Sequence, residues 1–354
     1  MTFALAIPSG VGFAQMRANM PMGQPGIPAS GAKPVPTEQA VLNTLMAMGQ
    51  KPIYALEPAE ARMQPGFADG VKAVLRQQGR PTTPPPGVTA TDITVAGAAG
   101  PLHAKLYRPS AMRVGARGHA PVTVYFHGGG WVIADSNTYD TSARALARET
   151  GGLVISVDYR RAPEAKFPAQ HNDAFAAYRW ALANAASLGG DPSWMILAGE
   201  SAGGNLSVAT AIAARDAHVQ MPVAVLSVYP IAGTDLNTPS YQDSANAMPL
   251  NRAGMAYFLY HTARGPADLQ DPRINLVAAD LHGLPPVTIV AAQADPLRSE
   301  GQMLADRLRA AGVRVTRREF PGTTHEFFGA DALIPEARQA QDFAGQQLRA
   351  ALGR

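Results

Sequence analysis

Short, nearly continuous apolar runs separated by helical stretches are the feature that most restricts the fold of this chain. The runs lack polar alternation, as expected of strands buried on both faces of a sheet. They lie at Val122–Phe126, Leu153–Val157, Met195–Ala198, Val223–Val228 and Val287–Ala292. Because helical patterns lie between them, consecutive strands are expected to run parallel through crossover connections. The sequence therefore predicts an α/β fold with a mostly parallel, doubly wound sheet.

Flanking patterns extend this core at both ends. Val88–Val95 and Leu102–Arg108 read as an opening pair of strands, and Val313–Phe320 as a late strand. Helices are expected at Thr138–Thr150, Gln170–Ser187, Gly203–Ala214, Ser299–Ala311 and Glu336–Leu352. We assign the catalytic domain to residues 83–354.

The segment before this core has a different character. Residues 1–36 are rich in Gly, Pro and Met and are predicted to be flexible. Within them, Thr2–Ala14 is small and apolar and ends in a pattern that resembles the end of a signal peptide, although the first basic residue is Arg17. We favour a signal-peptide remnant over an ordinary tail, and hence a periplasmic or secreted location over a cytoplasmic one.

A helical cap is expected beside the sheet. Residues 37–82 contain two helical stretches, Thr37–Gly49 and Pro58–Gln78, and a proline-rich segment then marks a boundary. The stretch from about 235 to 284 is long for a crossover and contains a third helical pattern, Asn251–Ala263. We expect this helix to lie over the strand ends and to complete the cap.

Composition excludes several classes of function. The 30 basic and 27 acidic side chains leave a net charge of only +3, which does not suggest a nucleic-acid partner. The chain has no cysteine, so disulfides and thiolate chemistry are excluded. No apolar run reaches the roughly 18–20 residues that a transmembrane helix requires.

The stretch from Gly199 to Gly204 carries the strongest functional signal. Ser201 lies between Gly199 and Gly203, after one apolar run and before a helix, which is the strand–turn–helix context of a nucleophile elbow. The glycines let the backbone pass a sharp turn that projects the hydroxyl. The alternative is a glycine-rich turn with an exposed serine.

A second glycine-rich stretch follows the strand Val122–Phe126. His127 precedes Gly128, Gly129 and Gly130, and three consecutive glycines suit a loop whose backbone N–H groups must face a cavity. We interpret it as an oxyanion hole. A phosphate-binding loop is less consistent, because no Lys-Ser/Thr ending follows.

A serine nucleophile needs a base and an orienting acid. His325 follows the last predicted strand, and Asp295 follows Val287–Ala292, so both are expected at the carboxyl edge of the sheet. Along the chain the three residues come in the order Ser201, Asp295, His325, unlike the trypsin-type and subtilisin-type triads, in which the serine comes last. Asp271 is a weaker candidate because it lies in the cap segment. We expect the following histidines to be surface residues: His103, His119, His171, His218, His261 and His282.

Together these motifs resemble the hormone-sensitive-lipase-like bacterial esterases, which have the α/β-hydrolase fold. The match covers roughly residues 85–350 and includes Asp158–Glu164. It implies that the backbone N–H groups of Gly129, Gly130 and Ala202 form the oxyanion hole and that His127 is structural. It also implies a small-molecule ester substrate of short acyl chain, no metal or cofactor, and a monomer or homodimer.

Three residues depart from the family pattern. Glu200 stands where Asp is frequent, Arg161 replaces a usual Leu, and Glu326 replaces a small residue after the histidine. A charge beside Ser201 could alter hydrogen bonding to the glycine loop. The sequence therefore predicts a carboxylesterase that acts through an acyl-enzyme. An amidase, lactonase or acyltransferase with the same triad, and a ligand-binding homologue without activity, remain alternatives.

Overall fold

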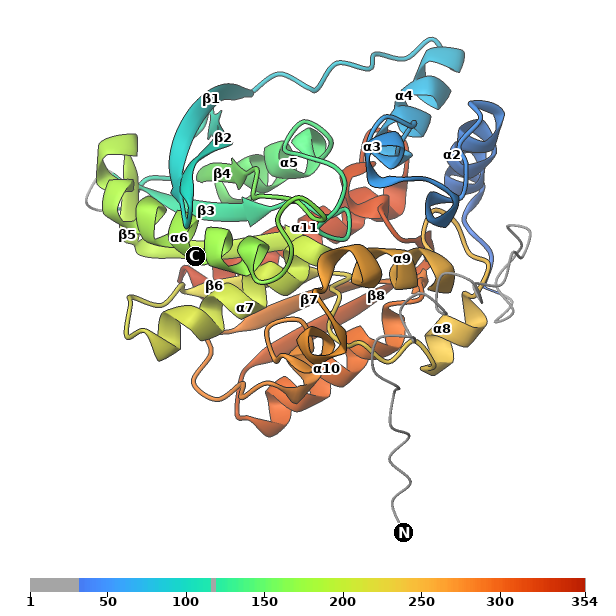
Figure 1. Ribbon diagram of the computed structural model, residues 1–354. Coiled ribbons are helices and arrows are strands. Elements are labelled where there is room, and N and C mark those ends of the chain that lie inside the picture. The colour runs from blue at the N-terminus through green and yellow to red at the C-terminus, as the bar shows by residue number, and fades with distance from the viewer. Residues whose placement is uncertain (1–31, 116–118, 354) are drawn as a thin grey trace.

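An eight-stranded sheet forms the centre of the molecule (Figure 1). The computed structural model describes residues 32–115 and 119–353. The strands run in the spatial order β1-β2-β4-β3-β5-β6-β7-β8. Their bounds are β1 Val88–Gly97, β2 Gly100–Pro109, β3 Ala120–Phe126, β4 Leu153–Val157, β5 Gly190–Glu200, β6 Ala224–Val228, β7 Val287–Ala294 and β8 Val315–Thr324.

The sheet is parallel except at one edge. Strands β1 and β2 pair antiparallel, as do β2 and β4, and every pairing from β4 to β8 is parallel. Every residue of β3, β4 and β6 is buried, which is why each strand is apolar apart from a single Ser or Thr. The predicted doubly wound, mostly parallel sheet is confirmed.

Helices cover both faces of the sheet. The α-helices are α2 Pro36–Ala47, α3 Pro58–Ala61, α4 Phe67–Gln77, α5 Asp140–Thr150, α6 Ala169–Asn184, α7 Ala202–Asp216, α8 Pro239–Asp243, α9 Arg252–Thr262, α10 Arg298–Ala310 and α11 Pro335–Ala351. Short 3₁₀ helices are η1 Ile53–Ala55, η2 Ala186–Leu188, η3 Pro266–Gln270, η4 Leu276–Ala278 and η5 Phe327–Gly329. Buried side chains of α6, α7 and α10 share one core cluster, and those of α5 and α11 share the other.

The predicted helix Pro58–Gln78 is wrong in one respect, because it is interrupted. Helix α3 ends at Ala61 and α4 begins only at Phe67. Pro65 has no N–H to continue the helix and disfavours helical geometry at the residue before it. Gly66 is the N-cap of α4, and its N–H donates to Asp69 Oδ2 at 3.0 Å. The resulting bend places the intervening segment against the pocket described below.

Helices α2 to α4 lie together near one end of the sheet, and α8 and α9 lie nearby (Figure 1). The proline-rich segment between α4 and β1 has neither helix nor strand and is largely exposed.

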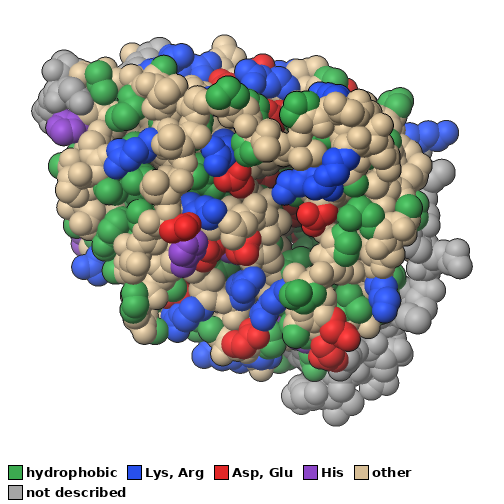
Figure 2. All heavy atoms as spheres, turned by 90° about the horizontal axis from the view of Figure 1, so that it is seen from above, with side chains coloured by type: hydrophobic (Ala, Val, Ile, Leu, Met, Phe, Trp, Pro, Cys, Tyr) green, Lys and Arg blue, Asp and Glu red, His purple; other side chains and the backbone are tan. Residues whose placement is uncertain are grey.

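The predicted signal remnant at Thr2–Ala14, and most of the flexible segment 1–36, lie outside the described residues. Within the described ranges, no helix combines the length and apolarity that crossing a bilayer requires. On the face in Figure 2, acidic and basic side chains are interspersed.

Candidate active site

Ser201 occupies the sharp turn between β5 and α7. Its backbone has φ 57° and ψ −117°, a conformation that is strained for a residue with a side chain. The turn closes because two glycines permit very short approaches. A Cβ on Gly199 would lie 2.3 Å from the Gly203 carbonyl oxygen, and one on Gly203 would lie 1.9 Å from the Phe126 carbonyl oxygen. Any larger residue at either position would open the elbow.

The other two predicted side chains converge on Ser201 from neighbouring strand ends. Asp295 follows β7 and His325 follows β8. His325 Nε2 lies 2.9 Å from Ser201 Oγ, and His325 Nδ1 lies 2.8 Å from Asp295 Oδ2. Since the carboxylate accepts from Nδ1–H, Nε2 is left as the acceptor for the serine hydroxyl. The structure thus places all three in one hydrogen-bonded series.

Burial and nearby carboxylates set the proton affinity of His325. The three side chains are nearly inaccessible, with exposures of 3% for Ser201, 3% for His325 and 1% for Asp295. Burial lowers the pKa of His325, but the charge and hydrogen bond of Asp295, with the charges of Glu326 and Glu200, more than compensate. The pKa of the imidazole therefore lies above its ordinary value of 6.5.

The glycine loop between β3 and α5 borders the same cavity. Gly129 and Gly130 have φ of 90° and 58°, and a Cβ on Gly130 would lie 2.1 Å from the ring of Phe258. Among the described residues, the N–H groups of Gly129, Gly130 and Ala202 donate to no backbone carbonyl in a loop or turn. These donors are therefore available to an oxyanion.

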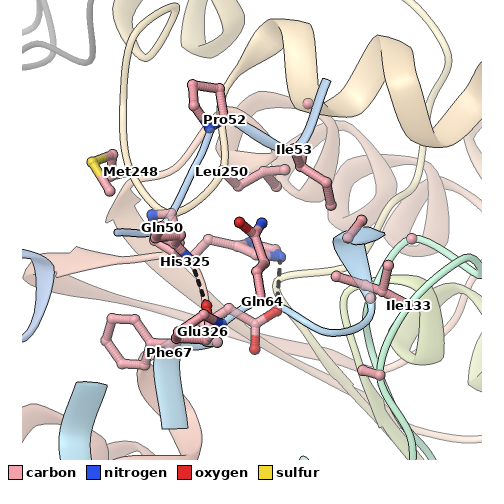
Figure 3. A pocket seen from close by; sticks show the side chains of 18 of the residues that line it. Gln50, Pro52, Ile53, Gln64, Phe67, Ile133, Met248, Leu250, His325 and Glu326 are labelled. Carbon is pink, nitrogen blue, oxygen red and sulfur yellow. Dashed lines mark hydrogen bonds and ion pairs between the residues drawn. The ribbon is translucent and has the colours of Figure 1, made fainter. Parts of the chain in front are cut away.

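A cavity of about 260 Å³ opens above Ser201 and His325 (Figure 3). Its walls come from two segments far apart in sequence, residues 46–69 and residues 248–258, together with the glycine loop. The labelled lining side chains are Gln50, Pro52, Ile53, Gln64, Phe67, Ile133, Met248, Leu250, His325 and Glu326. Mostly apolar walls around a few polar groups are typical of a small-molecule site.

Comparison with known proteins identifies the family. A family model described as the alpha/beta hydrolase fold matches residues 123–329. The chain belongs to the α/β-hydrolase fold family. It is 39% identical over 283 residues to the carboxylesterase NlhH of Mycobacterium tuberculosis, covering 77% of this chain and 87% of that protein. It is 32% identical over 290 residues to an ethyl acetate hydrolase of Pseudomonas putida, with coverage of 81% and 88%.

Two solved esterase structures also resemble this chain over most of its length. A hyperthermophilic esterase from Pyrobaculum calidifontis has a TM-score of 0.80 and 32% identity, covering 90% of this chain and 98% of that one. A thermostable esterase from Pseudomonas putida has a TM-score of 0.81 and 28% identity, covering 93% and 99%. The resemblance to the hormone-sensitive-lipase-like esterases, a family of carboxylic ester hydrolases within the α/β-hydrolase fold, is therefore confirmed.

The three departures from the family pattern have defined places in this α/β-hydrolase. The Glu200 carboxylate accepts hydrogen bonds from Tyr125 and Tyr229, not from the glycine loop. Burial raises the pKa of Glu200 to about 7. Arg161 Nη1 donates to the Ala134 carbonyl at 2.6 Å. Glu326 lines the cavity beside His325.

His127 is a packed residue beneath the glycine loop. Its ring is fully buried and stacks on Tyr159, with centroids 4.2 Å apart. The Tyr159 hydroxyl donates to the His127 carbonyl at 2.8 Å, and burial lowers the pKa of His127. A neutral, stacked imidazole braces the loop, which suits the structural role that the resemblance implies.

Arg62 links the segment after α3 to the glycine loop, a contact that the sequence analysis did not predict. Its Nε donates to the Val132 carbonyl and its Nη2 to the Ala162 carbonyl, both at 2.8 Å. The guanidinium also makes a bidentate pair with Glu164, with both distances 2.7 Å, and this pairing lowers the pKa of Glu164 to about 2. The partners are 70 or more residues apart in the chain, so no local pattern could reveal them.

Glu38 of α2 is a second unforeseen link, because it contacts the residue before His325. Its Oε1 accepts hydrogen bonds from the backbone N–H and the hydroxyl of Thr324. The side chain is fully buried and Oε2 has no partner among the described residues. Burial outweighs the hydrogen bonds and raises the pKa of Glu38 to about 8.

Glu38 is therefore expected to make stability fall as pH rises. The folded protein keeps this proton up to about pH 8, whereas the unfolded chain releases it near the ordinary value of 4.5. Between these values the unfolded state binds fewer protons, so rising pH favours unfolding, by on the order of 1–3 kcal/mol for one group. Glu38→Gln, which mimics the protonated acid, should raise the melting temperature by several degrees at pH 8 and change it little at pH 5.

Glu38→Ala is the matched control for this experiment, because it removes the contacts to Thr324 at every pH. We expect Glu38→Ala to lower the melting temperature at both pH values. If Glu38→Gln is less stable than the parent at pH 8, the buried carboxyl is ionised there and the assignment is wrong.

Among the other histidines, His171 contradicts the expectation of a surface residue. It is buried, and its Nε2 lies 3.0 Å from Asn205 Oδ1, so burial lowers its pKa to about 4. His171 is buried because α6, which carries it, packs against α7, which carries Asn205. The alternative acid Asp271 pairs with Arg273 at 2.8 Å and makes no contact with His325 among those found for the described residues.

Proposed function

We propose that this chain hydrolyses short-chain carboxylic esters through an acyl-enzyme formed on Ser201. The observation that carries the proposal is the hydrogen-bonded series in which Ser201 Oγ lies 2.9 Å from His325 Nε2, and His325 Nδ1 lies 2.8 Å from Asp295 Oδ2. The esterase names of the relatives support the reaction class. The short-chain preference is the finer part of the proposal and rests on the cavity.

In acylation, Ser201 Oγ attacks the carbonyl carbon while His325 Nε2 takes the hydroxyl proton. Asp295 holds the imidazole in the required tautomer and stabilises the imidazolium that forms. The carbonyl oxygen gains a negative charge, which the N–H groups of Gly129, Gly130 and Ala202 stabilise. Each such donor contributes on the order of 3 kcal/mol in the transition state.

The intermediate then collapses. The bond from carbon to the alkoxy oxygen breaks, and His325 Nε2–H gives its proton to the departing alcohol. In deacylation a water molecule attacks the acyl carbon while His325 Nε2 takes its proton. The bond from carbon to Ser201 Oγ then breaks, His325 returns the proton to Oγ, and the carboxylic acid leaves the regenerated serine. Helix α7 begins at Ala202, so its N-terminus lies behind the developing charge.

The cavity supports small substrates. Its volume of about 260 Å³ is below the roughly 300–1,000 Å³ typical of sites for drug-sized ligands. We propose that residues 37–82 and the segment from about 235 to 284 act as the cap, because side chains from both line this cavity. A long acyl chain would have to displace cap side chains such as Phe67 or Leu250.

A panel of p-nitrophenyl esters with acyl chains of two to twelve carbons tests the proposal. We expect the largest kcat/KM with acyl chains of a few carbons, and a decline for longer ones. A matched lactone and a matched anilide, measured in parallel, should react much more slowly. A maximum at long chains would remove the short-chain claim, and preferred hydrolysis of the anilide would favour an amidase.

The pH profile of kcat/KM should report the base. Because the pKa of His325 is raised above its ordinary value of 6.5, activity is expected to fall as pH drops through a point above 6.5. Only neutral imidazole can accept the Ser201 proton, which fixes the sign of the effect. A rate that stays constant down to about pH 4 would contradict the role of His325.

A further inference from the structure

Glu326 places a second carboxylate beside the reacting atoms. It follows His325 directly and lines the same cavity, where Figure 3 shows both side chains. Glu326 Oε1 lies 3.9 Å from His325 Nε2, the nitrogen that contacts Ser201. The Tyr139 hydroxyl donates to both carboxylate oxygens, at 2.7 and 2.8 Å, and holds the group in this position.

The backbone at Glu326 is in the left-handed region, with φ 73°. Residues with a side chain seldom adopt this conformation, and it concentrates at functional sites. A glycine would fit the turn without strain. The turn itself does not require a carboxylate at this position, so the strained backbone of Glu326 indicates a functional role for its side chain.

The charge of Glu326 is not neutralised by a basic side chain. Among the described residues, its one ion-pair contact within 4.0 Å is with His325. Two basic residues, Arg62 and Lys51, also line the cavity. Arg62 is engaged by Glu164 and two carbonyl oxygens, and no ion pair between Lys51 and Glu326 is found in the described part of the chain. About a quarter of the Glu326 side chain is exposed, so a ligand can reach it.

The position of the carboxylate indicates which part of a substrate it meets. His325 Nε2 must come within hydrogen-bond distance, about 3 Å, of the departing alkoxy oxygen. With 3.9 Å from Nε2 to Oε1, the carboxylate lies at most about 7 Å from that oxygen. Glu326 is therefore within reach of a charged group a few carbons beyond the alkoxy oxygen.

We propose that Glu326 selects esters whose alcohol portion carries a positive charge, such as an ammonium group two or three carbons from the ester oxygen. The proposal rests on the proposed esterase function and names its substrate class. A carboxylate that has no Lys or Arg partner attracts a cation more strongly in a partly enclosed cavity than in water. Tyr54, Phe67, Tyr139 and Phe258 line the same cavity, and an aromatic ring attracts an ammonium group that lies over its face.

The test compares acetylcholine with 3,3-dimethylbutyl acetate, its uncharged isostere, at low ionic strength and pH 8. For the parent chain we expect kcat/KM to favour the cation by on the order of tenfold or more. In Glu326→Gln this ratio should fall toward one. Because the ratio is taken within each protein, any general effect of the substitution on catalysis cancels.

Asp306→Asn serves as the control, since Asp306 is an exposed carboxylate of α10 that does not line the cavity. It removes one negative charge and should leave the ratio near that of the parent. A parent ratio of one or less, or a ratio that Glu326→Gln does not change, would overturn the inference. If the parent chain does not hydrolyse p-nitrophenyl acetate, the esterase proposal itself is refuted.

Discussion

Ser201→Ala is expected to lower kcat for ester hydrolysis by about 10⁴- to 10⁶-fold, the range found when a triad nucleophile is removed. Without the hydroxyl no acyl-enzyme can form, and only binding and the oxyanion donors remain to assist water. The substitution removes one oxygen from a buried site, so the fold should persist. Initial rates on p-nitrophenyl acetate or butyrate, with melting curves to verify folding, measure the effect.

Ser207→Ala is the matched control for this substitution. Ser207 is a buried serine on α7, the helix that follows Ser201, and its hydroxyl donates to the Gly203 carbonyl at 2.8 Å. Losing this bond should reduce stability by about 1 kcal/mol and leave most of the activity. If Ser201→Ala kept more than about a hundredth of the parent rate, which is far above the residual activity expected, another group would have to be the nucleophile.

Asp295→Asn is expected to lower kcat by about 10⁴-fold with little change in KM. An amide at this position presents either oxygen or N–H to His325 Nδ1. Because Asp295 Oδ1 already accepts from the Leu297 N–H at 2.9 Å, the amide oxygen should keep that contact and turn its NH₂ toward the imidazole. His325 would then carry its proton on Nε2 and could no longer accept one from Ser201.

Asp271→Asn tests the same reasoning from the other side. Asp271 is the other acid that the sequence allowed, and the structure pairs it with Arg273. We expect this variant to retain activity within about threefold, because one partly exposed ion pair contributes about 1 kcal/mol or less. Equal losses in the two variants would mean that Asp295 has no special role.

The parts of the fold that could be predicted are those with a local or topological cause. The run Leu153–Val157 matches β4 residue for residue. A strand that is buried on both faces is almost wholly apolar, so its first and last residues can be recognised in the sequence. The convergence of Asp295 and His325 could also be foreseen, since loops after parallel strands meet at one edge of the sheet. Ser201 was marked by the glycines that its turn requires.

The parts that could not be predicted depend on contacts between distant segments. Glu38 and Thr324 are 286 positions apart, and nothing near either residue indicates the other. The break between α3 and α4 was missed because the apolar period continues across Pro65, although proline cannot continue the helix. The burial of His171 was missed because the buried face of α6 includes polar residues. Its partner Asn205 could not be identified from the sequence, because the contact depends on how α6 and α7 pack.

Covalent labelling tests the central claim most directly. After treatment with a fluorophosphonate, intact mass should show one phosphonyl group per chain, and peptide mapping should place it on Ser201. Hydrolysis of p-nitrophenyl butyrate should fall in proportion to labelling, and Ser201→Ala should take up no label. A folded, active chain that is not labelled, or one labelled elsewhere, would contradict the account.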